Sequence, residues 1–362
     1  MSLTRRSFSL LTAAGLGLGI ALGALSATAA DKLKVAFVYV GPIGDFGWSY
    51  QHNQGRLSVE KHFGDKVETS YVESVGEGAD AERVIRSLAQ KGNDLIFTTS
   101  FGYMNPTIKV AKQFPKVKFE HATGYKRSKN VATYLSRTYE GRYVTGYLAA
   151  HMSKTGTAGY IASFPIPEVI MGINAFLLGA HSVNPDIKLK IVWAYTWFDP
   201  PKEADAAKVL MDQGADIITQ HTDSTAALQA AAERNVLAFG QASDMIQFAP
   251  NTQLTSIIDE WGPYYVERTQ AVLDGTWTSG DTWHGMSDGL VVMAPYTNMP
   301  NDVATLAAET AKSIQTGAFH PFTGPIYNQA GELVVPEGEV ADDGMLAGMM
   351  FYVKGIDDEV PN

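Results

Sequence analysis

The stretch KVAFVYV at residues 34–40, followed by GPIGDFGW at residues 41–48, determines how the chain folds. The first part is a short run of β-branched, aromatic and small apolar residues, as in a buried strand, and the second is rich in turn-forming glycine and proline. An amphipathic segment at 49–63 then predicts a helix. A strand that passes through such a loop into a helix begins a βαβ unit, so we expect an α/β fold with parallel strands.

The same alternation continues along the chain and forms two similar series. The first series predicts strands at 67–72, 94–98, 118–122 and 131–134, with helices at 79–91 and 105–114. The second predicts helices at 140–153, 168–184, 202–212 and 226–234, and strands at 157–163, 188–195, 216–220, 236–240 and 254–258. Two α/β lobes are therefore expected, and no low-complexity linker separates them.

The first residues of the chain carry the pattern of an export signal. Arg5 and Arg6 precede an apolar stretch without charge, and ATA at 27–29 forms a small-residue cleavage site. We expect a twin-arginine signal cleaved near Ala29 or Ala30, although the lysine usual after the motif is missing and general secretion stays open. The chain has no cysteine, which excludes disulfides and a lipid-modified cysteine, so a protein free in the periplasm is expected.

Composition and motifs favour binding over catalysis. The chain has 28 basic and 38 acidic residues among 362, which argues against nucleic acid as a partner. It contains no glycine-rich phosphate loop, no Gly-x-Ser-x-Gly elbow and no thiol nucleophile. The eight histidines stand singly, without metal-ligand spacing. We expect no enzyme activity, no cofactor and no metal.

The ends of the predicted strands hold an unusual number of aromatic and acidic residues. In open α/β sheets, ligands bind beyond the carboxyl ends of the strands, so these residues are candidates for a binding site. Aromatic rings from two facing lobes can sandwich a flat ring while carboxylates accept its N–H groups, which fits a nucleobase. Taken singly, each aromatic residue is explained just as well by packing within a lobe as by ligand binding. The residues are Asp45, Phe46, Trp48, Phe101, Tyr103, Tyr125, Trp197, Phe198, Asp199, His221, Asp223 and Asp244.

An ordered set of motifs resembles the basic membrane protein family of ABC-transporter substrate-binding proteins. These motifs are GDFGWS at 44–49, YEGRY at 139–143, GYLAA at 146–150, VNP at 183–185, WFDPPK at 197–202 and GADII at 214–218. The resemblance implies a type I periplasmic-binding-protein fold, in which two Rossmann-like lobes joined by three crossovers close on a ligand. It also implies uptake of purine nucleosides or bases and a permease partner in the inner membrane. We expect the receptor to be a monomer.

This resemblance leads us to expect a particular division of the chain. A cleaved signal would occupy 1–30, and a C-terminal docked tail 336–362. The N-terminal lobe would comprise 31–135 plus 245–257, and the C-terminal lobe 136–244 plus 258–335.

The resemblance also assigns site residues one by one. Asp45 matches the first-loop aspartate of the family, and Trp48 stands where that loop usually has phenylalanine. Trp197 or Phe198 matches the second aromatic of the base sandwich. Asp244 matches the last aspartate of a Gly-Val-Asp-x-Asp loop.

Two positions depart from the family pattern. Ala242 replaces the first aspartate of that loop, and Asp259 replaces a lysine that helps to hold the ribose hydroxyls. Ribose hydroxyl groups that are buried without hydrogen-bond partners weaken binding, so the expected ligand is a free, adenine-like purine base rather than a nucleoside. Expected roles are stacking for Trp48 and Trp197, hydrogen-bond acceptance for Asp45, Asp223 and Asp244, and pocket walls for Tyr103 and Trp261.

Three alternatives remain open from the sequence. A sugar receptor of the same fold would use the same stacking rings and carboxylates. An exported nucleosidase would use Asp45 and Asp223 as a carboxylate pair. A sensing partner for a membrane receptor would use the same pocket without transport.

Overall fold

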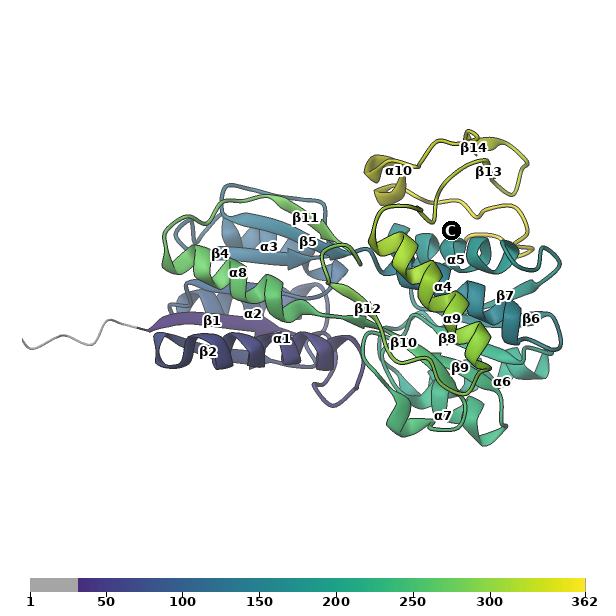
Figure 1. Ribbon diagram of the computed structural model, residues 1–362. Helices are drawn as coiled ribbons and strands as arrows, with labels where there is room; N and C mark the ends of the chain where they lie inside the picture. The colour runs from purple at the N-terminus through teal and green to yellow at the C-terminus, as the bar shows by residue number, and fades with distance from the viewer. Residues whose placement is uncertain (1–31, 362) are drawn as a thin grey trace, which may run out of the picture. The chain divides into compact units, whose positions relative to one another are not determined.

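The computed structural model describes residues 32–361. The predicted export signal, with Arg5, Arg6 and the cleavage site near Ala29 and Ala30, lies outside the described residues. The described part folds into two α/β lobes, each built on a six-stranded sheet (Figure 1).

The first lobe is a parallel sheet in the order β11-β5-β4-β3-β1-β2. Its strands are β1 (Leu33–Val38), β2 (Val67–Val72), β3 (Leu95–Thr98), β4 (Lys118–Ala122), β5 (Val131–Ser136) and β11 (Asp281–His284). Its helices are α1 (Trp48–Phe63), α2 (Ala79–Gln90), α3 (Met104–Ala111) and α8 (Trp261–Leu273).

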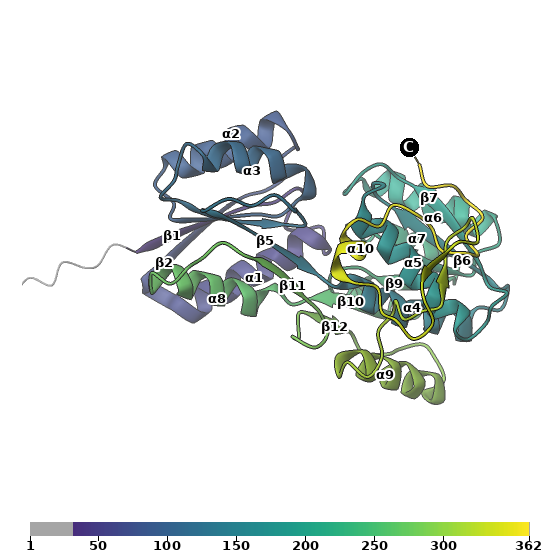
Figure 2. The same ribbon diagram turned by 90° about the horizontal axis from the view of Figure 1, so that it is seen from above.

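Strand β1 shows why this sheet is covered on both faces. Val35 and Phe37 point to one side and pack with α1 and α8, whereas Ala36 and Val38 point to the other side and pack with α2 and α3. Figure 2 shows these two helix pairs on opposite faces of the sheet. Because both faces are buried from Val35 onward, the strand is apolar from there to its end, as buried parallel strands usually are.

The second lobe repeats this plan with the sheet order β12-β10-β9-β8-β6-β7, in which β12 alone pairs antiparallel. Its strands are β6 (Thr157–Ala162), β7 (Lys188–Trp193), β8 (Ile217–Gln220), β9 (Leu237–Gly240), β10 (Gln253–Asp259) and β12 (Val291–Met293). Its helices are α4 (Thr138–Met152), α5 (Pro167–His181), α6 (Pro200–Asp212), α7 (Ala226–Glu233) and α9 (Asn301–Gln315).

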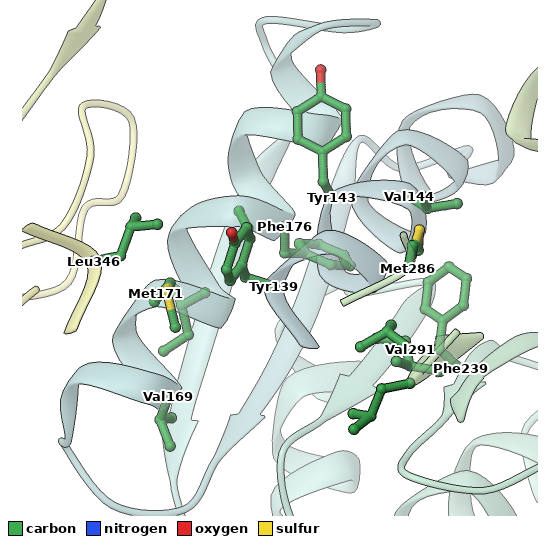
Figure 3. Packing of buried hydrophobic residues seen from close by; sticks show 14 of the residues in the cluster. Tyr139, Tyr143, Val144, Val169, Met171, Phe176, Phe239, Met286, Val291 and Leu346 are labelled. Carbon is green, nitrogen blue, oxygen red and sulfur yellow. The ribbon is translucent and has the colours of Figure 1, made fainter. Parts of the chain in front are cut away.

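The core of the second lobe lies between its sheet and the helix pair α4 and α5. Phe176 of α5 and Phe239 of β9 are buried there, with ring centroids 6.4 Å apart. Figure 3 shows them among the side chains of this cluster, together with Val144 and Val291. The two helices approach closely because Gly146 and Gly179 each lie against backbone of the other helix, where a Cβ would fall within 2.0 Å of a carbonyl oxygen.

The chain passes between the lobes three times: from β5 to α4, from β10 to α8, and from β11 to β12. The expected α/β fold with two lobes and three crossovers is confirmed. The expected lobe boundaries do not match the strand pairing, because β10 pairs with β9 in the second lobe, while α8 and β11 belong to the first. Residues 245–257 therefore lie in the second lobe, and the chain re-enters the first lobe at 261.

The C-terminal region packs on the second lobe. It contains the small antiparallel pair β13 (Ile326–Tyr327) and β14 (Leu333–Val335), and the short helix α10 (Asp343–Ala347). The amide of Asn174 on α5 donates to the Phe351 carbonyl at 2.8 Å and accepts from the Val353 N–H at 3.0 Å. Among the helices of residues 32–361, none has both the length and the apolar character needed to cross a membrane.

Candidate functional site

A cavity with about 20 Å³ of free volume lies between the two lobes, at the carboxyl ends of their strands. This is room for little more than one water molecule, because the lobes are in contact around it. Its walls come from both lobes: Val40, Trp48, Ser100, Phe101 and Thr123 from the first, and Glu168, Trp197, His221, Asp223 and Gln241 from the second. We call this space the central cavity. Five of the candidate residues from the sequence line it: Trp48, Phe101, Trp197, His221 and Asp223.

The Trp48 ring is held by contacts behind it. Its indole N–H donates to the Thr99 carbonyl at 2.6 Å. Its edge meets His52 at a centroid distance of 4.3 Å and Trp261 at 5.5 Å, both near perpendicular. His52 in turn stacks on Trp261, with an interplanar angle of 17°. This support fixes the orientation of the ring in the cavity wall.

Trp197 stands on the opposite lobe. It follows β7 in a loop, and its ring packs at a tilt against Phe164 with centroids 5.0 Å apart. Its indole N–H donates to Glu77 Oε1 of the first lobe at 3.3 Å. The same oxygen accepts from the Ser100 hydroxyl at 2.6 Å. Trp197 therefore contributes both to the cavity wall and to the contact between lobes.

Polar atoms without protein partners gather on the cavity walls. Asp223 Oδ2, His221 Nδ1 and Thr123 Oγ1 are buried without a hydrogen-bond partner. An unpaired buried polar group is costly, so such groups in a native site generally serve a ligand or ordered water. Because their residues line one cavity together with aromatic side chains, the cavity can offer both flat apolar surface and hydrogen-bonding groups to a ligand.

The two carboxyl groups of the cavity favour their neutral forms. Burial raises the pKa of Asp223 well above its usual value, and the carboxylates of Asp45, Glu203 and Glu168 add to this. Burial and the Asp259 carboxylate raise the pKa of Glu168 to about 8, with Arg142 opposing. A neutral carboxyl group offers one O–H donor as well as acceptor oxygens, so each can bond a ligand edge that carries both kinds of group.

The remaining titratable groups at the cavity are His221 and the nearby Arg142. Burial lowers the pKa of His221, and Arg142 adds to the effect, so the imidazole is neutral at physiological pH. Arg142 is fully buried and donates to the Gln220 carbonyl at 2.7 Å, to Thr219 Oγ1 at 3.1 Å and to Gln241. Among residues 32–361, no three His, Asp or Glu side chains gather in a way that could hold a metal ion.

The Asp45 carboxylate is used inside the protein. It accepts backbone N–H groups from Gly47 at 2.8 Å, Tyr50 at 2.9 Å and Ser49 at 3.1 Å, which satisfies the first turn of α1. Burial raises the pKa of Asp45 to about 6, against the lowering effect of these three N–H groups. The carboxylate thus holds the loop that carries Trp48 and is a support for the site.

Three further predicted residues make contacts within the protein. Asp244 Oδ1 accepts from the Ile246 N–H at 3.1 Å and from the Gln253 amide at 2.8 Å. The Tyr103 hydroxyl donates to the Val75 carbonyl at 2.6 Å. Trp261 is fully buried behind Trp48.

The other two predicted aromatics lie near the contact between lobes. Phe46, at a φ of 59°, packs against Phe248 of the second lobe with centroids 4.8 Å apart. Phe198 lines an outer groove next to the central cavity, where its Cβ faces Gly41.

The lobes are in contact around the central cavity, so the arrangement is closed. A Cβ placed on Gly47 would lie only 2.1 Å from the Asp223 carbonyl oxygen. The Ser243 hydroxyl of the second lobe donates to the Phe46 carbonyl of the first. With the bond from Trp197 to Glu77, these contacts join the two lobes on the side of the cavity where the loops meet.

The sequence analysis missed Glu168 as a site residue because it assigned this residue only to the start of a helix. Its place in the first turn after strand β6 is the same kind of position that singled out Asp223. Asp259, the position of the missing ribose lysine, is fully buried at the end of β10, where burial raises its pKa to about 7.

Comparison with known proteins identifies the family. The model of the Bmp family, described as ABC transporter substrate-binding protein PnrA-like, matches residues 32–317. A purine-binding protein of Brucella abortus (strain 2308) is 63% identical over 343 residues, which cover 95% of this chain and 98% of the relative. A protein of Haloferax volcanii, provisionally named an ABC transporter glucose-binding protein, is 37% identical over 333 residues, covering 92% of this chain and 82% of the relative.

The fold is shared with solved solute-binding proteins. An ABC transporter solute-binding protein of Aeropyrum pernix K1 superposes with a TM-score of 0.69 at 21% identity, covering 87% of this chain and 95% of that chain. The predicted type I periplasmic-binding-protein fold is thereby confirmed. With a family model that spans most of its length and a relative of high identity, this chain belongs to the Bmp family of ABC transporter substrate-binding proteins.

Proposed function

We propose that the protein captures a purine base, adenine-like, in the central cavity and delivers it to an ABC permease. The observation that carries this proposal is the pairing of Trp48 and Trp197, from opposite lobes, with the two carboxyl groups of Asp223 and Glu168 in one enclosed space. Flat heteroaromatic rings with hydrogen-bonding edges fit such walls. The name of the Brucella relative, a purine-binding protein at 63% identity, supports the same class of ligand.

The protonation of the cavity matches the edge of a purine. Burial raises the pKa of both carboxyl groups, to about 8 for Glu168, so Glu168 is neutral near pH 7 and the neutral form of Asp223 is favoured. A neutral carboxyl group donates one hydrogen bond and accepts another, and a purine edge with an amino group beside a ring nitrogen offers the complementary pair. We assign Asp223 and Glu168 to the edges of the base, with Trp48 and Trp197 on its faces.

A free base is favoured over a nucleoside because the family's ribose lysine is absent. Asp259 occupies that position and is fully buried at the crossover, so it leaves the ribose hydroxyls without the expected cationic partner. The second candidate is a sugar, which the name of the Haloferax relative favours. A pyranose also stacks on indole faces, but its many hydroxyl groups need more partners than a base does.

Transport also requires export and lobe closure. We propose that the signal before residue 31 sends the protein to the periplasm, where it acts as a freely diffusing monomer without enzyme activity. Ligand would bind the open form, and the contacts from Ser243 to Phe46 and from Trp197 to Glu77 would form on closure. The closed form would be the one that the permease recognises.

Calorimetry tests the ligand class directly. The purified protein, lacking 1–30, is titrated with adenine, guanine, adenosine, guanosine and glucose. We expect adenine to bind most tightly, with nucleosides weaker and glucose without measurable heat. Tighter binding of nucleosides or glucose than of adenine would overturn the proposal. Incubation with adenosine and chromatography for free adenine separates a receptor, which leaves the nucleoside intact, from a nucleosidase.

A further inference from the structure

A second cavity adjoins the central cavity on the side of the crossovers. It has a free volume of about 100 Å³, and Phe101, Thr123 and Glu168 line both spaces. We call it the hinge-side annex. Because three side chains form walls of both cavities, the annex is a direct neighbour of the central cavity.

Beyond the three shared residues, the walls of the annex are mainly apolar. They are Leu135, Ile166, Pro167, Met171, Trp283, Leu346 and Ala347, with Gly124 and the exposed Tyr125 at one side. Figure 3 shows two of these side chains, Met171 of α5 and Leu346 of α10. The Trp283 indole N–H is already bonded to the Ser136 carbonyl at 3.1 Å, so it is not free for a ligand.

Ordered contacts hold these walls in place. Asp343, at the start of α10, receives two bonds from the Arg137 guanidinium, at 2.7 and 2.8 Å. Arg137 lies on the crossover from β5 to α4, and its side chain also covers the Trp283 ring at 4.6 Å. The helix that supplies Leu346 and Ala347 is therefore fixed to the hinge, which makes the annex a preformed space.

We propose that the annex receives an apolar substituent of the bound base, so that the natural ligands include purines carrying an alkyl or aryl group. This inference rests on the proposed binding of a purine in the central cavity. A ribose would leave its hydroxyl groups against Leu135, Ile166, Pro167 and Met171, where hydrogen bonds to water would be lost without replacement. Burial of an apolar group against the same walls strengthens binding, and Kd should fall about fourfold for each methylene that is fully buried.

The test is a ligand series on the wild-type protein. Calorimetry compares adenine with adenines that carry methyl, propyl or benzyl groups, in one series on the exocyclic nitrogen and in another on ring nitrogen 9. Adenosine and a hydroxyethyl derivative serve as polar controls of similar size. We expect at least one apolar series to gain affinity with size, to tenfold or more over adenine, while the polar controls do not.

The outcomes separate this inference from the function on which it rests. If adenine binds and neither apolar series exceeds it, the annex inference fails while the proposed function stands. If neither adenine nor any derivative binds, both fail.

A variant locates the gain in the annex. Ala347 is exposed on α10 and lines the annex, so Ala347→Trp fills this space from the outside. We expect it to lower the ratio of benzyladenine to adenine affinity at least fivefold, whereas Ala347→Ser leaves that ratio within twofold of wild type. An unchanged ratio in Ala347→Trp would overturn the placement of the substituent.

Discussion

Gly47 gives the sharpest test of the closed arrangement. It lies in the loop before α1, where its Cα faces the backbone of Asp223 on the other lobe. The Cβ of Gly47→Ala would lie 2.1 Å from the Asp223 carbonyl oxygen, about 0.9 Å inside the 3.0 Å that Cβ contacts essentially never cross. The lobes would have to move apart at this point. Overpacking of this kind typically costs about 1–3 kcal/mol, which raises Kd for the ligand roughly 5- to 150-fold.

The matched control lies in the same loop. Gly44→Ala places a Cβ with no other atom within 4 Å, so its affinity should equal that of wild type. Calorimetry with adenine measures the affinity, and small-angle X-ray scattering measures whether the ligand still closes the protein. Melting of the ligand-free proteins checks that Gly47→Ala folds. A folded Gly47→Ala protein with wild-type affinity and the wild-type scattering change on ligand addition would refute the reasoning.

Three further predictions concern the walls of the central cavity. Trp48→Ala should weaken adenine binding roughly 5- to 150-fold in calorimetry, because it removes one stacking face; a change below twofold would contradict the stacking role. Glu168→Gln should raise the melting temperature of the ligand-free protein at pH 8.5 and not at pH 4.5. The sign follows because the pKa of Glu168 rises from 4.5 to about 8 in the folded state, so the wild-type protein loses stability as pH rises between these values. An equal difference in melting temperature between variant and wild type at both pH values would contradict this reasoning. Trp197→Phe keeps a ring but loses the indole hydrogen bond to Glu77, so Kd for adenine should rise by less than about tenfold. Trp197→Ala removes the ring as well, so it should raise Kd further than Trp197→Phe does.

The fold could be predicted from the sequence because local patterns were consistent along the chain. The expected strands at 67–72 and 118–122 coincide with β2 and β4. The lobe to which β10 belongs could not be predicted, since the sequence of a strand does not show which of two sheets it pairs with. The placement of 245–257 in the first lobe failed for this reason.

The position of the central cavity could be predicted from the sequence, and its lining residues only in part. Parallel strands bring their carboxyl ends together, so residues after strands were found near the cavity, among them Trp48, Trp197 and Asp223. The position of a residue after a strand does not show whether its side chain is free to contact a ligand or is already bonded within the protein. Asp45 accepts three backbone N–H groups from the start of α1 and the residue before it, whereas Glu168, in the first turn of a helix, lines the cavity.

The arrangement of indoles around the ligand space has a practical consequence. Trp48 and Trp197 line the central cavity, and Trp283 lines the annex, while the chain has six tryptophans in all. Indole emission is sensitive to stacking and to local polarity, so occupancy of this protein should be visible in its own fluorescence. Single replacement of Trp283 by phenylalanine would then divide the optical signal of the base from that of its substituent, without any dye or label.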